Sequence, residues 1–308
     1  MDPQSRYIWM NDRLLDYADA TVPFMTSGLH YGIAVFEGIR CYRTVDGPAV
    51  FRLGEHARRL IDSARVLGFR DLPWTADDAA AAILQTVAAN EFDECYIRPV
   101  IWLGDGGWNL TVDSGRPQFG VAVWQWGAYL GDEALENGIR ANVASYTRHH
   151  VNVAMTKAKI SGNYANSVLA KTESMRLGFD EAIMLDPQGF VAECTGENIF
   201  VVRGGKIFTP PPAEILEGIT RDSLITIARE LGHEVIEQPI SRDQLYIADE
   251  VFVCGTAAEC IALREIDFRV IGTGKMGPVT RSIQRVFHAA IRGQDDRYRR
   301  WLTPVRRA

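Results

Sequence analysis

The stretch TKAKISGNY, residues 156–164, combines two lysines with a small polar turn that ends in a tyrosine. Lys157 and Lys159 are two of only five lysines in a chain with 28 arginines. A lysine amine can form an imine with a carbonyl cofactor, and the hydroxyl of Tyr164 could donate a hydrogen bond to the same group. Taken alone, the stretch is also typical of an exposed basic turn before a helix, which the pattern predicts over 165–177. The rest of the chain has to decide between these interpretations.

Length and composition predict a globular protein with two domains. The 308 residues are 47% hydrophobic and 23% charged, which is enough chain for two separate cores. The net charge of −6 and the lack of a long basic run argue against a nucleic-acid partner. No apolar run approaches the roughly 18 residues of a membrane-spanning helix, so no membrane partner is expected.

The cysteines and the N-terminus favour a cytoplasmic protein. The five cysteines form no CxxC pair, so neither a metal site nor a disulfide framework is expected. Residues 1–17 are polar and lack the apolar segment of a signal peptide.

The pattern of helices and strands predicts a fold of the α+β / α/β class, with a small α/β domain first and an α/β pattern from residue 139 on. A stripe that includes Leu60, Ile61 and Ala64 predicts a helix over 54–68, and Thr75 is a candidate N-cap for a second helix that reaches Asn90. We expect a small domain at 1–126, a connector at 127–138 and a large domain at 139–308. Strands are predicted at 7–10, 14–16, 96–102, 118–125, 182–186, 198–203, 206–208, 234–238 and 250–254, and later helices at 220–232, 241–247 and 278–292.

Pyridoxal phosphate (PLP) needs a lysine, an acid for its ring nitrogen, a cup of N–H and hydroxyl groups for its phosphate, and a donor to its phenolic oxygen. The segment 191–200 places Glu193 and Glu197 around a Thr-Gly turn, where a carboxylate could pair with the ring nitrogen. Thr220 begins a helix directly after a Gly-Ile pair, and a helix N-terminus suits a phosphate. The turn at 254–258 presents backbone amides beside a hydroxyl. Each of these three features could also be an ordinary turn or cap.

The local pattern gives the following interpretations for several residues in the first half of the chain. Arg59 lies opposite the apolar stripe, so periodicity predicts a solvent-exposed side chain. Tyr96 and Arg98 share one face of a strand, which usually means a surface pair. The loop at 103–115 displays Trp108 and Leu110, which suggests a lid or an interface.

Five motifs in this order resemble the branched-chain aminotransferases of the PLP fold-type IV group. They are HYGIAVFEGIRCY (30–42), AKISGNY (158–164), GENIF (196–200), EGITRDS (217–223) and ADEVFVCGTAAE (248–259). The resemblance extends from about Tyr7 to Trp301. It implies the two-domain fold of D-amino acid aminotransferase-like proteins and PLP as the cofactor.

The resemblance also implies a role for each candidate. Lys159 carries the cofactor, because it has the family's spacing from Gly-Asn-Tyr, while Lys157 does not. Tyr164 bonds the phenolic oxygen and Glu193 the ring nitrogen. The implied phosphate ligands are Arg59, Ile219, Thr220 and Thr256. The implied substrate contacts are the amides of Thr256 and Ala257 and the hydroxyl of Tyr96 at the α-carboxylate, with Phe36, Trp126, Tyr129, Ala257 and Ala258 around the side chain.

The same resemblance implies a homodimer in which Tyr31 and the 107–110 loop, with Leu110, complete the neighbouring site. The expected reaction moves the amino group of leucine, isoleucine or valine to 2-oxoglutarate, with Lys159 moving the Cα proton. An apolar pocket would leave the γ-carboxylate of glutamate unpaired, so a cation must reach it. Arg98 is the first candidate and Arg40 the second.

The substrate range stays open. The loop at 103–116 does not match the family pattern, so activity as an (R)-selective amine transaminase, alone or in addition, is compatible with the same fold. D-amino acid aminotransferases and aminodeoxychorismate lyase are further relatives. A PLP-binding protein without turnover and a structural oligomer without cofactor are the non-enzymatic alternatives.

Overall fold

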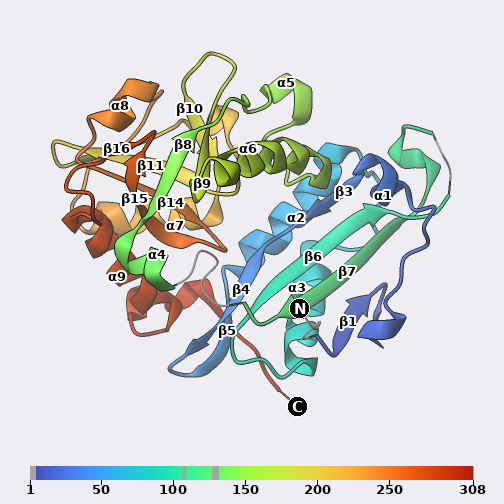
Figure 1. Cartoon of the computed structure of the whole chain (residues 1–308). Helices are drawn as coiled ribbons and strands as arrows, with labels where there is room; N and C mark the ends of the chain where they lie inside the picture. The colour runs from blue at the N-terminus through green and yellow to red at the C-terminus, as the bar shows by residue number, and fades with distance from the viewer. Residues whose placement is uncertain (1–4, 107–108, 127–131, 308) are drawn as a thin grey trace. The chain divides into compact units, whose positions relative to one another are not determined.

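The computed structural model describes residues 5–106, 109–126 and 132–307 (Figure 1). The chain divides into two compact units. The first unit consists of Met1–Trp126, Lys157–Asn163 and Ala289–Ala308, and the second of Gly127–Thr156 and Tyr164–His288. Each is described by itself below.

The first unit is built on an antiparallel sheet. Its strands follow the order β17-β5-β4-β6-β7-β1-β2, and β3 pairs with β6 beside β4. β6 and β7 are its longest strands, and Tyr96 lies opposite Trp124 in their register. The strands are β1 Tyr7–Met10, β2 Arg13–Asp16, β3 Ala34–Phe36, β4 Ile39–Thr44, β5 Gly47–Phe51, β6 Cys95–Leu103, β7 Pro117–Trp124 and β17 Leu302–Pro304.

Helices α2, Leu53–Leu67, and α3, Ala76–Ala89, cover one face of this sheet. Alternate residues of β6, such as Ile97 and Ile101, point into the core that these helices close. Thr75 is the N-cap of α3, as the sequence predicts, and the structure adds a reciprocal capping box between Thr75 and Asp78. The side chains of Tyr96 and Arg98 therefore project from the opposite face of the sheet.

The segment 157–163 belongs to the first unit, although the sequence analysis placed it in the large domain. Its backbone is bound to β3, because the amide of Phe36 donates to the carbonyl oxygen of Lys159 over 3.0 Å and Val35 forms a β-bridge with Ile160. The C-terminal residues also join this unit, since β17 pairs with β5. Both differences arise from long-range backbone pairing, which residue composition does not reveal.

The second unit holds a mixed sheet with the order β10-β9-β8-β15-β14-β11-β12-β13, and β16 pairs with β15. β8 runs parallel to β9 and to β15, and β12 runs parallel to β13, while the other pairs are antiparallel. The strands are β8 Ile139–Val143, β9 Glu181–Leu185, β10 Val191–Cys194, β11 Asn198–Arg203, β12 Lys206–Thr209, β13 Val235–Glu237, β14 Glu250–Gly255, β15 Glu259–Ile266 and β16 Arg269–Val270.

Most helices fall where periodicity predicts them. The predictions at 54–68, 165–177, 220–232, 241–247 and 278–292 are confirmed within two residues at each end. Part of the expected connector is helical, because α4 occupies Asp132–Asn137. The remaining helices are α1 Ser27–Tyr31, α5 Val151–Ala154, α6 Tyr164–Arg176, α7 Ile219–Glu230, α8 Arg242–Tyr246 and α9 Pro278–Ile291, with 3₁₀ turns at Tyr17–Asp19, Val112–Ser114, Ser161–Asn163, Pro212–Glu214 and Asp296–Trp301. Among the described residues, no helix is both long and apolar enough to cross a bilayer.

Candidate functional site

Lys159 and Lys157 differ in their surroundings. Lys159 is half-buried, and its Nζ lies 5.0 Å from the centre of the Phe36 ring. Its amide donates to Oγ of Ser63 on α2 over 3.0 Å, while its carbonyl accepts from β3, so the backbone is fixed on both sides. Lys157 is exposed. The two amines therefore differ in exposure, and the backbone of Lys159 is held by hydrogen bonds on both sides.

Two glycines, Gly32 and Gly162, allow the segment before β3 to approach the turn after Lys159 closely. Gly32 has a φ of +66° after α1, and a Cβ there would lie 2.9 Å from the Cα of Gly162. The motifs HYG and SGN, which lie far apart in the sequence, therefore touch through their glycines. This contact places the turn after Lys159 directly against the segment that leads into β3.

Arg59 is mostly buried, contrary to the prediction from periodicity. Its side chain is 15% exposed, and its Nε and Nη2 donate to the two carboxylate oxygens of Glu37 over 2.5 and 2.8 Å. His56 Nδ1 lies 2.8 Å from Glu37 Oε2. His56, Arg59 and Ser63 form a polar row along α2 that faces the core rather than solvent. The row was missed because the sequence does not show that a buried carboxylate lies opposite it.

This cluster has perturbed ionisation. Hydrogen bonds and charge from Arg59 outweigh the effect of burial and hold the pKa of Glu37 far below its usual value. Burial lowers the pKa of His56, so its ring is neutral at neutral pH. Glu37 and Arg59 are therefore a fixed ion pair beneath the strand that carries Phe36.

On the face of the first sheet opposite α2 and α3, Arg98 lies among aromatic rings. Its guanidinium carbon is 4.7 Å from the ring centre of Phe36, 5.4 Å from that of Tyr96 and 5.7 Å from that of Trp124. Nη2 donates to the hydroxyl of Tyr96 over 3.3 Å, and the buried Nε has no hydrogen-bond partner in the described part of the chain. In those same residues no carboxylate pairs with Arg98, and its pair with Tyr96 is part-buried rather than at the surface.

The remaining predicted pocket residues of this unit lie nearby. Arg40, which is buried, is the cross-strand neighbour of Tyr96, and the Trp126 ring centre is 4.8 Å from that of Tyr96. Trp124 was not predicted, although its position two residues before Trp126 in a strand could have signalled a shared face. Tyr129 lies outside the described residues.

Tyr31 and Leu110 lie together elsewhere on the first unit. They are 44% and 81% exposed and line an open pocket with Ile33, Leu67 and Val112. Gly107 and Trp108 of the same predicted loop lie outside the described residues. Side chains this exposed and apolar are available to another surface.

In the second unit, Glu193 is a buried carboxylate with an arginine partner. Nε and Nη2 of Arg148 both lie 2.7 Å from Oε1 of Glu193. Oε2 accepts from Asn198 Nδ2 and from the amide of Leu216, over 3.2 and 3.3 Å. The sequence analysis missed Arg148, because the two residues are 45 positions apart and no local pattern joins them.

Strand register brings the other candidates of this unit to the same sheet end. Asn198 pairs with Cys254, which places the turn before β11 beside the turn at 255–258 that contains Thr256, Ala257 and Ala258. A Cβ on Gly218 would lie 2.0 Å from Asn198 Oδ1, so a larger residue before α7 would have to displace the side chain of Asn198. Ile219 and Thr220, both buried, form the first turn of that helix. Tyr164 is half-buried at the start of α6, which packs on β9.

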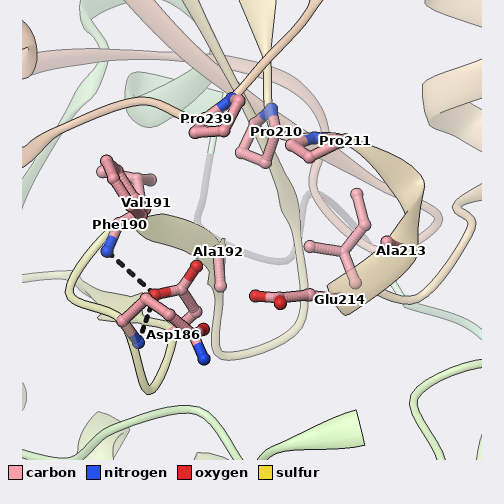
Figure 2. Close-up of a pocket in the computed structure, with 11 residues that line it drawn as sticks. Asp186, Phe190, Val191, Ala192, Pro210, Pro211, Ala213, Glu214 and Pro239 are labelled. Atoms are coloured by element: carbon pink, nitrogen blue, oxygen red, sulfur yellow. Dashed lines mark hydrogen bonds between the residues drawn. The ribbon is translucent and has the colours of Figure 1, made fainter.

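A separate pocket of the second unit contains none of the predicted site residues (Figure 2). Pro210, Pro211 and Pro239 line one side, and Glu214 faces Asp186 on the other. Asp186 accepts the amides of Gln188 and Phe190 and so closes its own turn. Burial and the neighbouring Asp186 raise the pKa of Glu214. One carboxylate oxygen of Asp186, Oδ1, accepts both of these backbone hydrogen bonds.

Residues 34–266 match the model of the family described as amino-transferase class IV. The chain belongs to the class IV aminotransferases. It is 44% identical over 299 residues to a branched-chain-amino-acid aminotransferase of Pseudomonas aeruginosa PAO1, and the match covers 97% of each chain.

Among solved structures, the chain is similar to two branched-chain amino acid aminotransferases. That of Escherichia coli has a TM-score of 0.95 at 44% identity, and the match covers 98% of this chain and 100% of the other. That of Thermobaculum terrenum, solved in its PLP form, has a TM-score of 0.93 at 36% identity and covers 99% and 100% of the two chains. At this similarity the class IV aminotransferase has the PLP fold-type IV architecture that the sequence motifs imply.

Proposed function

We propose that this class IV aminotransferase uses PLP to transfer the amino group between branched-chain L-amino acids and 2-oxoglutarate. The observation that carries the proposal is the identity of 44% over 97% of both chains with a branched-chain-amino-acid aminotransferase. The residues that the reaction needs are present in the sequence, and contacts within their own units hold Lys159, Arg59 and Glu193. The proposal includes a cytoplasmic location, since all five cysteines are buried free thiols, as in a reducing compartment.

The donor groups of the chain fit PLP. Lys159 offers an amine on a rigid backbone, and Glu193 offers a carboxylate whose charge Arg148 supports. Gly218, as N-cap of α7, has no side chain to occupy the first amides of that helix, so an anion can approach them. When bound, the cofactor supplies an electron sink for the bond that breaks at the substrate's Cα.

The chain's own groups then have separate tasks. Lys159 would remove the Cα proton of the substrate and later give it back, so that one amine could serve as both base and acid. Glu193 holds the proton on the ring nitrogen, because Arg148 favours the charged form of the carboxylate. Tyr164 donates to the phenolic oxygen. Arg59, Ile219, Thr220 and Thr256 hold the phosphate.

Substrate recognition separates polar from apolar contacts. The hydroxyl of Tyr96 and the amides of Thr256 and Ala257 bind the α-carboxylate. Phe36 and Trp126 surround the side chain, with Tyr129 and Ala258. Arg98 meets the γ-carboxylate of glutamate, and its aromatic surroundings support this role because they leave its charge without a competing carboxylate among the described residues.

The proposal is tested first at the lysines. Lys159→Ala is expected to remove essentially all transamination and all cofactor that borohydride reduction would fix to the protein. Lys157→Ala is the matched control and should keep both, because its side chain is exposed. Mass spectrometry after reduction measures the covalent attachment. An inactive Lys157 variant beside an active Lys159 variant would refute the assignment.

The second test concerns the two substrates. Arg98→Met should slow the L-glutamate half-reaction by about 10- to 1000-fold and the L-leucine half-reaction by much less, because only glutamate loses a charged contact. Stopped-flow measurement of both half-reactions on the same variant decides this. Equal slowing would assign Arg98 to the architecture or to the α-carboxylate. Adding (R)-1-phenylethylamine and D-alanine as amino donors tests the amine and D-amino acid alternatives.

The proposal also includes a homodimer. Phe24, Leu29 and Leu110 are 75%, 66% and 81% exposed, and large exposed apolar side chains are usual at protein interfaces. Tyr31 and Leu110 would then reach the neighbouring site. Mixing Lys159→Ala with Tyr31→Ala subunits should restore activity in hybrids. Inactive hybrids, or a fully active monomer in sedimentation, would contradict this part.

A further inference from the structure

Trp124 belongs to an aromatic enclosure, formed with Phe36 and Tyr96, around the guanidinium of Arg98. The three ring centres lie within 6 Å of the guanidinium carbon, at 4.7, 5.4 and 5.7 Å. Trp124 is the cross-strand neighbour of Tyr96, with ring centres 5.0 Å apart, and it also contacts the ring of Trp126 at 5.9 Å. It therefore contacts Arg98, Tyr96 and Trp126 together.

The enclosure differs from the environments of two other buried arginines. Arg59 and Arg148 are each neutralised by a buried glutamate. The contacts of Arg98 in the described residues are a tyrosine hydroxyl and π faces, and its Nε is buried without a hydrogen-bond partner. An aromatic face attracts a cation through its quadrupole but carries no net charge. A cation held in this way keeps its full attraction for an anion that arrives later.

We propose that Trp124 is a specificity-determining residue, which holds Arg98 in the pocket and so sets the preference between acidic and branched-chain substrates. The inference rests on the proposed role of Arg98 at the γ-carboxylate. When leucine occupies the pocket, the rings stabilise the guanidinium without an anion. When glutamate occupies it, the guanidinium is already in place and no protein carboxylate has to be displaced.

Of the three aromatic residues around Arg98, Trp124 is the one whose substitution should affect the acidic substrate alone. Phe36 and Tyr96 also line the pocket or meet the α-carboxylate, so changes there affect every substrate. Trp124 instead touches the arginine and the two pocket aromatics. Loss of its π face should therefore act on the acidic substrate and leave the apolar one nearly unchanged.

The experiment measures the L-glutamate and L-leucine half-reactions by stopped flow on the PLP-loaded enzyme. Trp124→Leu should raise the apparent dissociation constant of L-glutamate relative to that of L-leucine by about 3- to 30-fold, the range expected for one lost cation–π contact. The limiting rates should change little, because Arg98 meets the end of the substrate that does not react. Trp124→Phe should keep most of the preference.

Trp102→Leu is the matched control. Trp102 lies on the same face of β6 as Arg98 and is also half-buried, but its neighbours are Gly28 and Gly120 rather than Arg98. It loses the same volume from the same sheet. We expect the glutamate-to-leucine ratio of this variant to stay within about 2-fold of the wild type.

A double-mutant cycle separates Trp124 from a merely structural residue. If Trp124 acts through Arg98, then Trp124→Leu should change the ratio no further in an Arg98→Met background. An undiminished effect in that background would overturn the inference. The inference would also be overturned if Trp124→Leu left this ratio unchanged while Arg98→Met raised it, a result that leaves the proposed function intact. An unchanged ratio in Arg98→Met would overturn both this inference and the proposed role of Arg98 at the γ-carboxylate.

A second series keeps the test decisive if Trp124→Leu does not fold. Site-specific replacement of Trp124 by fluorinated tryptophans weakens the π face stepwise while keeping the shape nearly constant. The apparent dissociation constant of L-glutamate relative to that of L-leucine should rise with each added fluorine. A ratio independent of fluorination would mean that the indole only fills space, and the inference would be wrong.

Discussion

Each unit holds a deeply buried glutamate that is bound by an arginine and accompanied by a histidine, but the order of the three groups differs. In the first unit the carboxylate is central, since Glu37 takes contacts from both Arg59 and His56. In the second unit the arginine is central, since Arg148 binds Glu193 on one side and contacts His149 over 3.0 Å on the other.

The difference decides what each carboxylate can still do. Glu37 has short contacts on both oxygens, at 2.5 and 2.8 Å, so its binding capacity is used within the unit. Glu193 receives both close contacts from Arg148 on Oε1, while on Oε2 the contacts to Asn198 and Leu216 are longer, at 3.2 and 3.3 Å. The first arrangement suits a structural anchor, and the second suits a carboxylate that must meet a further cation.

The largest expected effect follows from the structural character of Glu37. Glu37→Gln should lower the free energy of unfolding by about 3–5 kcal/mol, because it leaves Arg59 as a buried charge without its partner. Urea unfolding of the cofactor-free protein, followed by circular dichroism, measures the change. Glu94→Gln is the control: the pair with Arg292 is roughly one-third exposed, so its loss should cost less than about 1 kcal/mol. Equal losses of unfolding free energy in the two variants would show that the buried Glu37 pair is no more important for stability than the partly exposed Glu94 pair.

The next effect is on the reaction rather than on stability. Glu193→Gln should still bind PLP. It should raise the activation free energy of Cα proton removal by about 2–4 kcal/mol, since an amide cannot hold the protonated ring nitrogen. Single-turnover kinetics with deuterated and ordinary L-leucine isolate this step. Glu197→Gln, in the same turn and equally buried, should have a much smaller effect on the rate. Unchanged rates in Glu193→Gln would disprove the role.

The smallest effect appears in the dependence of stability on pH. Burial lowers the pKa of His56 below 6.5, so the unfolded chain takes up a proton there before the folded chain does. Stability should therefore fall as the pH drops below about 6.5, with a slope of at most about 1.4 kcal/mol per pH unit from this group. His56→Gln should flatten the curve between pH 6.5 and 5, above the range in which Glu37 is protonated.

His149 provides the corresponding measurement in the second unit. Burial and the adjacent Arg148 lower its pKa to about 4, so its contribution has the same sign and is lost between about pH 6.5 and 4. A variant such as His149→Gln should change the curve independently of His56→Gln. If both substitutions left the curve unchanged, the histidines would not be held neutral in either cluster.

The local sequence determined much of this protein. The motif around Lys159, the Thr-Gly turn after Glu193 and the glycine before α7 could each be recognised from neighbouring residues, since spacing and turn chemistry act over a few positions. The apolar stripe of α2 and the N-cap at Thr75 could be predicted for the same reason. Motifs of this kind were enough to imply the family and the cofactor.

Only the tertiary structure decided which groups face one another. Three contacts join residues of different strands or helices: Glu37 with Arg59, Arg148 with Glu193, and Trp124 with Arg98. Hydrophobic periodicity describes one helix or strand at a time, so it does not reveal such contacts. It predicted an exposed Arg59 because a helical stripe records apolar burial and cannot register a buried charge that has a distant partner. The same limit applied to the segment 157–163, whose place in the first unit depends on backbone hydrogen bonds to β3, which any sequence of side chains can form.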